Sequence, residues 1–389
     1  MNLFRLLGLF FALFQVTGCD SKQAPSQNGR EEKIGISVPE APNLVAHPSE
    51  KPVPPLKLDV PTAMPEQLDG KNLTKMNEGE LLTRANLAMG KEDYTKAAAY
   101  QYWYVQKSKT GQYNLACFLA QIGKTDAAFY WLQLAAIEEG VDTAHAERDE
   151  DLVSLRRDSR WGKVRQYLGD CNRYFESAPT SRTVVILPKG YQNSKPITAV
   201  VWLHGLGSRP EDFANDGCRE HADALNVAII GVSGTKARGP RSFVWAENVE
   251  QDGKRLRDAL EEASAQVTIK KGQIITFGFS QGAQVGLEVA ARYPEEYAGA
   301  IVLSPGARSN LNSIKPSSLL SMRGFVLCCG AEEHPGNVML TANDADWLRR
   351  AKAKIIHKPY PGVSAHSFPA DFDERFPEWI KFILKAQGE

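Results

Sequence analysis

The residues best suited to chemistry lie in one pentapeptide, Gly278-Phe279-Ser280-Gln281-Gly282. An apolar, β-rich run at 273–277 precedes this G-x-S-x-G pattern, and a helix-like run at 283–292 follows it. A sharp turn between a strand and a helix exposes the central serine and holds its backbone in a strained conformation, for which the flanking glycines make room. The pattern and its setting predict that Ser280 is a catalytic nucleophile.

A serine hydroxyl is a poor nucleophile at neutral pH, so this prediction requires a histidine base. Three histidines follow Ser280 in the chain. His366 lies in a loop rich in glycine, proline and serine, after an apolar run at 354–358 that predicts a strand. His357 falls inside that strand and His334 precedes a proline, so both are weaker candidates. We therefore predict His366 as the base.

The base needs a carboxylate to orient it, and we expect the three residues in the chain order serine, acid, histidine. Glu333 follows the apolar run at 323–329 after a short loop and is the predicted acid, with its neighbour Glu332 as the alternative. Other carboxylates fit less well, because they are expected to be exposed on the next helix or because they follow His366. These are Asp344 and Asp346 on the helix, and Asp371 and Asp373 after the histidine.

Acyl transfer also needs N–H groups that bind the negatively charged oxygen formed during the reaction. The backbone amide of Gln281, directly after the nucleophile, is one predicted donor, and that of Leu206 is the other. Leu206 lies in a glycine-containing loop, 204–208, that follows an apolar run. A dinucleotide-binding loop is excluded here because Pro210 occupies the third glycine position of G-x-G-x-x-G. His204 is interpreted as a packing residue beneath the loop.

These motifs, in this order, resemble the α/β-hydrolases of the carboxylesterase/phospholipase type, which include acyl-protein thioesterases. The resemblance spans about 182–387 and rests on the segments 202–207 with 211–213, 278–284, 293–306 and 362–366. It implies Ser280 as nucleophile, His366 as base, and the amides of Leu206 and Gln281 as the oxyanion hole. The family commonly has aspartate where this chain has Glu333, whose side chain is one methylene longer.

Apolar runs alternate with helix-like stretches throughout this half of the chain. Continuous apolar runs are typical of strands buried on both faces of a parallel sheet. We predict an α/β fold class, with a doubly wound, mostly parallel sheet in an α/β-hydrolase domain at 180–389. The predicted strands are 183–187, 197–203, 227–232, 273–279, 298–303, 323–329 and 354–358, and the predicted helices are 212–225, 249–265, 281–292, 338–353 and 374–386. The connections after Ser280 are too short for a large helical lid, so an open site is expected.

The N-terminal residues predict where in the cell the protein is located. An apolar run at 6–16 follows Arg5, is too short to span a bilayer, and ends in Val16-Thr17-Gly18-Cys19. This ending resembles the bacterial lipobox, in which cleavage leaves a lipid-modified cysteine as the first residue. We therefore predict a signal peptide at 1–18 and a lipid anchor on Cys19 in the bacterial cell envelope. Asp20 resembles an inner-membrane retention signal and favours the periplasmic face of that membrane. The alternative is an ordinary secretory signal.

Two segments separate the signal from the hydrolase domain. Residues 19–70 are rich in proline and polar residues and predict a disordered tether. Residues 71–170 predict a small all-α domain, in which 87–98 is echoed by 119–128 and Gly90 and Gly123 stand 33 residues apart. This spacing resembles tetratricopeptide repeats. Its aromatic residues are interpreted as core between helices, and its surface could bind a protein partner.

Composition excludes other classes of function. Basic and acidic residues number 46 each, so the chain lacks the basic surplus of a nucleic-acid-binding protein. The cysteines and histidines lack metal-ligand spacing, and neither a metal nor another cofactor is expected. Cys171 and Cys218 could pair, but no disulfide is assigned. Cys117, Cys328 and Cys329 lie in helix or strand patterns and are expected to be buried.

The sequence as a whole predicts a membrane-anchored serine hydrolase that cleaves carboxylic esters or thioesters through an acyl-enzyme intermediate. Two alternatives stay open. The first is a non-catalytic lipoprotein scaffold that binds a partner through its helical repeats. The second is a serine peptidase on the same fold, because the residues named above do not distinguish an ester from an amide.

Overall fold

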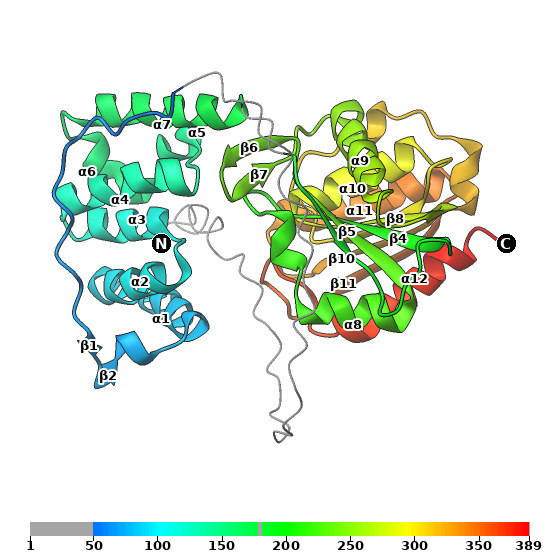
Figure 1. The fold of residues 1–389 in the computed structure, drawn as a ribbon, viewed down its shortest axis with the longest axis horizontal. Helices are drawn as coiled ribbons and strands as arrows, with labels where there is room; N and C mark the ends of the chain where they lie inside the picture. Colours follow the sequence, from blue (N-terminus) through cyan, green and yellow to red (C-terminus); the bar gives the residue numbers. More distant parts are fainter. Residues whose placement is uncertain (1–49, 178–180, 389) are drawn as a thin grey trace. The chain divides into compact units, whose positions relative to one another are not determined.

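The computed structural model describes residues 50–177 and 181–388, which form two compact units. One unit comprises the N-terminal helical residues together with the short turn Arg238–Arg241, and the other comprises the remaining C-terminal residues (Figure 1). The predicted signal peptide, Cys19 and the first part of the predicted tether lie outside the described residues. Among the residues that are described, no helix is long and apolar enough to cross a membrane.

The N-terminal unit is built from helices that pack in antiparallel pairs, α1 on α2 and α3 on α4 (Figure 1). Side-chain caps start several of them: Asn77 accepts a hydrogen bond from the Glu80 N–H, and Asp93 accepts one from the Lys96 N–H. The helices are α1 Glu78–Gly90, α2 Tyr94–Ser108, α3 Gln112–Gln121, α4 Thr125–Glu138, α5 Thr143–Ala146, α6 Val153–Arg156 and α7 Trp161–Glu176, preceded by the short strands β1 Gln67–Leu68 and β2 Lys71–Asn72.

The prediction of a disordered tether that extends to residue 70 is wrong for its last part. Residues 50–70 are hydrogen-bonded to the helices that follow. Gln133 of α4 donates to the Leu56 carbonyl and accepts from the Leu56 N–H, and the Trp103 indole N–H donates to the Pro65 carbonyl at 2.9 Å. The physical reason is that side chains of α2 and α4 supply hydrogen-bond partners for backbone groups of this extended segment.

The C-terminal unit confirms the predicted fold class. Within the described residues, seven strands form one sheet in the order β11-β10-β9-β8-β4-β5-β3, and all neighbours are parallel except β3, which runs antiparallel to β5. The strands are β3 Thr183–Ile186, β4 Ile197–Leu203, β5 Val227–Val232, β8 Ile269–Phe279, β9 Tyr297–Leu303, β10 Gly324–Gly330 and β11 Lys354–Tyr360. Every residue of β4, β5, β9 and β10 is buried, as the continuous apolar runs predict.

Helices cover both faces of this sheet, which is the doubly wound arrangement (Figure 1). Helices α9, α10 and α11 pack on one face, and α8 and α12 on the other. The helices are α8 Asp216–Leu225, α9 Val249–Ala263, α10 Gln281–Arg292, α11 Pro335–Arg350 and α12 Phe372–Lys385. A hairpin of two short strands, β6 Lys236–Gly239 and β7 Ser242–Val244, lies between β5 and α9 and was absent from the predicted elements.

Helix α11 differs from its prediction at two points. It begins at Pro335 instead of residue 338, because His334 caps it and a proline at the first helical position needs no hydrogen-bond partner for its nitrogen. Asp344, expected to be exposed, is instead only 2 % exposed and accepts a 2.7 Å hydrogen bond from the Ser309 hydroxyl. It can be buried because that hydroxyl satisfies one of its two oxygens.

Candidate active site

Ser280 stands at the point where β8 ends and α10 begins. Its backbone has φ of 55° and ψ of −124°, a conformation that is strained for a residue with a side chain. The two flanking glycines are required because backbone passes close to them. A Cβ on Gly278 would lie 2.3 Å from the Gly282 carbonyl oxygen, and one on Gly282 would lie 2.4 Å from the carbonyl oxygens of Leu203 and His204. The turn therefore presents the serine at the carboxyl end of a central strand, as the G-x-S-x-G pattern predicts.

His366 lies in the loop between β11 and α12 and faces Ser280. Its Nε2 is 2.9 Å from Ser280 Oγ, and its Nδ1 is hydrogen-bonded to Glu333 Oε1. In the neutral imidazole that fits these contacts, Nδ1–H donates to the carboxylate and Nε2 accepts from the serine hydroxyl. Both Ser280 and Glu333 are buried, at 7 % and 3 % exposure. Such a chain of contacts can carry a proton away from a serine that attacks a carbonyl carbon.

Glu333 follows β10 and is held by more than the histidine. Its Oε2 accepts from the Gly330 N–H at 3.3 Å, and its Oε1 accepts from the Asn337 side-chain amide at 2.8 Å. Burial acts to raise the pKa of Glu333, but the hydrogen bond and charge of His366, with smaller effects from Asn337 and Ser304, bring that pKa below its ordinary value. The carboxyl group is therefore ionised when it orients the imidazole.

The other residues weighed as acid or base lie elsewhere. The alternative acid, Glu332, is exposed, and its backbone N–H donates to the Val363 carbonyl. His357 lies half-buried in β11, where burial lowers its pKa, and His334 is exposed and accepts from the Gly336 N–H at the start of α11. The structure thus brings together Ser280, His366 and Glu333.

The loop that carries Leu206 passes directly beside the nucleophile. A Cβ on Gly205 would lie 3.3 Å from Ser280 Cβ. The loop is fixed by hydrogen bonds from the Gly207 N–H to the Phe243 carbonyl and from the Ser208 N–H to the Gly205 carbonyl. Leu206, between Gly205 and Gly207, is half-buried.

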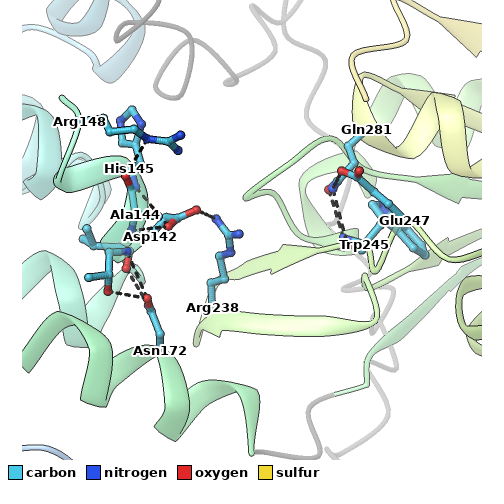
Figure 2. Close-up of polar contacts among 11 residues, drawn as sticks. Asp142, Ala144, His145, Arg148, Asn172, Arg238, Trp245, Glu247 and Gln281 are labelled. Atoms are coloured by element: carbon cyan, nitrogen blue, oxygen red, sulfur yellow. Dashed lines mark hydrogen bonds and ion pairs between the residues drawn. The ribbon is translucent and has the colours of Figure 1, made fainter. Parts of the chain in front are cut away.

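The second predicted donor, Gln281, is the first residue of α10, and an N–H at that position has no acceptor within its own helix. Its side chain fixes the adjoining segment. Gln281 Oε1 accepts from the Trp245 N–H at 3.1 Å, and Nε2 donates to Glu247 Oε1 at 2.8 Å (Figure 2). These contacts hold the N-terminus of α10 against residues 245–247 and so keep the amide of Gln281 in place.

His204 is fully buried and packs beneath the loop, as interpreted from the sequence. Its Nδ1 lies 2.6 Å from the Gly205 carbonyl oxygen, and its Nε2 accepts from the Gly234 N–H at 2.8 Å. Burial lowers the pKa of His204 to about 4, so the ring is neutral and Nδ1–H is the donor. The Trp245 indole N–H in turn donates to the His204 carbonyl. His204 therefore fixes the loop and is not a second base.

Three residues have roles in the site that the sequence does not predict, namely Trp245, Gly306 and Asn337. Gly306 is exposed, and a Cβ there would lie 3.0 Å from Ser280 Oγ, so it leaves space open beside the nucleophile. The only local signal for Asn337 is its place four residues after Glu333, behind a proline that starts a helix. The part played by Trp245 depends on contacts between distant segments, which no local pattern encodes.

A group with metal-ligand chemistry occurs among the described residues of the helical unit. The ligand atoms of Cys117, Asp149 and Asp151 lie within 4.8 Å of one another. However, Asp149 Oδ2 already accepts from the Tyr113 hydroxyl at 2.7 Å and lies 3.7 Å from Cys117 Sγ. Burial raises the pKa of the Cys117 thiol well above its usual value, which keeps it protonated. These hydrogen bonds join α3 to the segment around Asp149. Each cysteine in the described residues is a buried free thiol.

Comparisons with known proteins indicate an enzyme of the hydrolase class. Residues 244–383 match the family described as Phospholipase/Carboxylesterase. NocK of Nocardia uniformis subsp. tsuyamanensis, named for an inferred esterase activity, is 26% identical over 145 residues, which are 36% of this chain and 40% of that protein. MhqD of Bacillus subtilis (strain 168), named for an inferred hydrolase activity, is 25% identical over 206 residues, which are 49% of this chain and 96% of that protein.

A solved structure, the carboxylesterase of Bacillus cereus, is 20% identical, with a TM-score of 0.43 over 55% of this chain and 99% of that one. The present chain spans about two fifths of the length of NocK and nearly all of MhqD. The family match and the two relatives support a hydrolase enzyme of the carboxylesterase or serine hydrolase type.

Proposed function

We propose that the protein is a membrane-anchored serine hydrolase that cleaves carboxylic esters or thioesters through an acyl-enzyme intermediate. The observation that carries this proposal is the 2.9 Å contact between Ser280 Oγ and His366 Nε2, with Glu333 on the opposite nitrogen of the ring. The strained backbone of Ser280 and the match to a carboxylesterase family give independent support.

The reaction follows from these contacts. Ser280 Oγ attacks the ester carbonyl carbon while His366 Nε2 takes the hydroxyl proton, and Glu333 stabilises the resulting imidazolium through Nδ1–H. The amides of Leu206 and Gln281 donate to the oxygen that becomes negative. When the bond to the leaving oxygen or sulfur breaks, His366 returns the proton to that atom. Water, deprotonated by His366, then attacks the acyl group and restores Ser280.

The environment of the nucleophile favours bulky substrates. Gly306 is exposed beside Ser280 Oγ, and the stretch from 304 to 323 that begins there contains only two short 3-10 turns, Leu311–Ser313 and Ser318–Met322. A short connection of this kind leaves no room for a helical lid. We therefore expect an open site that admits an ester carried on a large molecule.

Labelling with a fluorophosphonate probe tests the nucleophile. Such probes phosphonylate an activated serine, so the folded wild-type protein should be labelled and Ser280→Ala should not. Labelling that persists in Ser280→Ala, or that is absent from folded wild type, contradicts the proposal, and absence would favour the non-catalytic scaffold. Rates on p-nitrophenyl esters of increasing chain length, compared with the matching anilides, then separate an esterase from a peptidase.

The location is also part of the proposal. The cysteine at the end of the lipobox-like motif, Cys19, would carry the lipid, and Asp20 favours the periplasmic face of the inner membrane. Several acyl chains on one residue give firm attachment without a transmembrane helix. The hydrolase would then act on substrates outside the cytoplasm, at or near a membrane surface.

A further inference from the structure

The carboxyl group of Glu333 is held at both oxygens. Oε2 accepts from the backbone of Gly330, whereas Oε1 is shared by two side chains, His366 and Asn337. The Asn337 amide nitrogen lies 2.8 Å from Oε1 and 3.5 Å from His366 Nδ1. Because Nδ1 carries a proton that it donates to Glu333, the amide can donate only to the carboxylate. The two donors therefore meet on one oxygen.

A glutamate at this position needs such a contact more than an aspartate would. Glutamate has one more rotatable bond, and its terminal torsion has a broad energy profile, so the carboxylate can adopt more orientations. The Gly330 N–H holds Oε2 at 3.3 Å and the imidazole holds Oε1, each from one direction. The amide of Asn337 adds a second direction from which Oε1 is held.

The start of α11 places this amide. His334 caps the helix, Pro335 is its first residue, and the Asn337 N–H donates to the His334 carbonyl at 2.9 Å. One turn later the Thr341 hydroxyl donates to the Asn337 carbonyl at 2.7 Å. The backbone of Asn337 is therefore fixed on both sides, and its side chain turns back toward the residue that precedes the cap.

We infer that Asn337 is a positioning residue of the active site, which holds the Glu333 carboxylate in the orientation that keeps His366 aligned on Ser280. This inference rests on the proposed function, because it assigns Asn337 an effect on turnover through Glu333. Among the contacts of the described residues the Asn337 amide reaches no atom of Ser280, and its hydrogen bond at 2.8 Å is to the Glu333 carboxylate.

Steady-state kinetics of Asn337→Ala on a p-nitrophenyl ester give the first test. We expect kcat to fall about tenfold, corresponding to one hydrogen bond to a charged group, with KM unchanged because the substrate is not contacted. Asn337→Asp keeps the shape but replaces the donor by a carboxylate beside Glu333, and should lose more activity than the alanine variant. Asn343→Ala is the matched control, since Asn343 is exposed on the same helix.

A double-mutant cycle with Glu333→Ala is the deciding test. If Asn337 acts through Glu333, then Asn337→Ala should have no further effect on kcat in the Glu333→Ala background. An equal loss in both backgrounds, or a kcat for Asn337→Ala equal to wild type, would overturn the inference. Thermal unfolding of each variant separates a loss of fold from a loss of alignment. Ester hydrolysis that persists in Ser280→Ala contradicts the proposed function itself. Hydrolysis that is lost in Ser280→Ala but unchanged in Asn337→Ala contradicts only this inference.

Discussion

At the scale of single residues, the site depends on which of two adjacent carboxylates reaches the histidine. Glu333 is buried and ionised against His366, whereas Glu332 is exposed. The carboxylate of such a triad selects the imidazole tautomer that can accept the serine proton, and it stabilises the imidazolium. The two glutamates therefore offer a comparison in which neighbouring residues of one type have different roles.

We predict that Glu333→Gln lowers kcat on a p-nitrophenyl ester by about 10³- to 10⁴-fold, because a neutral amide neither selects the tautomer nor stabilises the imidazolium. Glu332→Gln, the same change one position earlier, should retain activity close to wild type. The measurement is initial velocity at saturating substrate for the three proteins. Comparable losses in both variants would show that the acid has been wrongly assigned.

Ser280 and His366 are predictable from sequence because a glycine-flanked turn and a histidine in a loop rich in glycine, proline and serine are local signals. Glu333 is the predicted acid, but Glu332 stays open as its alternative, because side-chain direction after β10 depends on where the loop around Val363 passes. Asn337 is not predictable, because its role exists only once α11 begins at Pro335 and turns the amide back toward the acid.

At the scale of elements, the loop beside the nucleophile is tied to two helices by buried carboxylates. This loop starts at Ser304 and contains Gly306. The Ser309 hydroxyl donates to Asp344 of α11, and the Asn310 N–H donates to Glu288 of α10 at 2.6 Å. Burial raises the pKa of Asp344 to about 6, and the charge of Glu288 acts in the same direction against the hydrogen bonds from Ser309 and Gln284. Ionisation of Asp344 therefore lowers the free energy of unfolding at neutral pH.

We predict that Asp344→Asn stabilises the protein at neutral pH relative to wild type. The pKa of Asp344 is raised from 3.8 to about 6 in the folded state, so the wild-type fold loses stability as the pH rises through this window. The variant lacks this titration, and its carbonyl can still accept from Ser309. The difference in the free energy of unfolding, variant minus wild type, should grow by roughly 2–3 kcal/mol between pH 4 and pH 7.

Urea unfolding of both proteins at several pH values measures this difference, in which the other titrating groups largely cancel. A difference that stays constant with pH, or that shrinks as the pH rises, would be inconsistent with a buried carboxyl group of raised pKa.

The elements also show which parts of the fold a sequence can predict. Strands such as β4 and β5 are continuous apolar runs because both faces are buried, so composition alone identifies them. The β6–β7 hairpin is not predictable from composition, because Lys236–Gly239 contains two charged residues and a glycine. It becomes a strand only by pairing with β7. Asp344 was expected at the surface because an isolated aspartate on a helix usually is, and only its partner on a distant loop makes burial tolerable.

At the scale of the whole molecule, the described chain begins with residues 50–66 lying on the helices. Prolines keep such a segment extended. Extended backbone is nevertheless ordered here, because side chains of the helical unit hydrogen-bond to Leu56 and Pro65. The predicted tether is thereby limited to residues 19–49, which lie outside the described residues.

We predict that Cys19→Ser releases the protein from the membrane fraction of a bacterial host, because the variant cannot receive the lipid. Wild type should incorporate labelled palmitate and partition into detergent, and the variant should do neither. Ser21→Ala serves as the control and should behave as wild type. Membrane retention of Cys19→Ser, with its signal peptide removed, would instead support another mode of attachment.

The edge strand β11 has features that oppose aggregation. Among the described residues no strand pairs with its far side, so its backbone could template pairing with another chain. That strand carries Lys354 and Lys358, and Pro359 removes one N–H from its backbone. Charge and a missing donor both discourage the addition of a foreign strand. The proposed lipid anchor would hold many copies at high local concentration on one surface, where this protected edge strand would disfavour strand-to-strand aggregation.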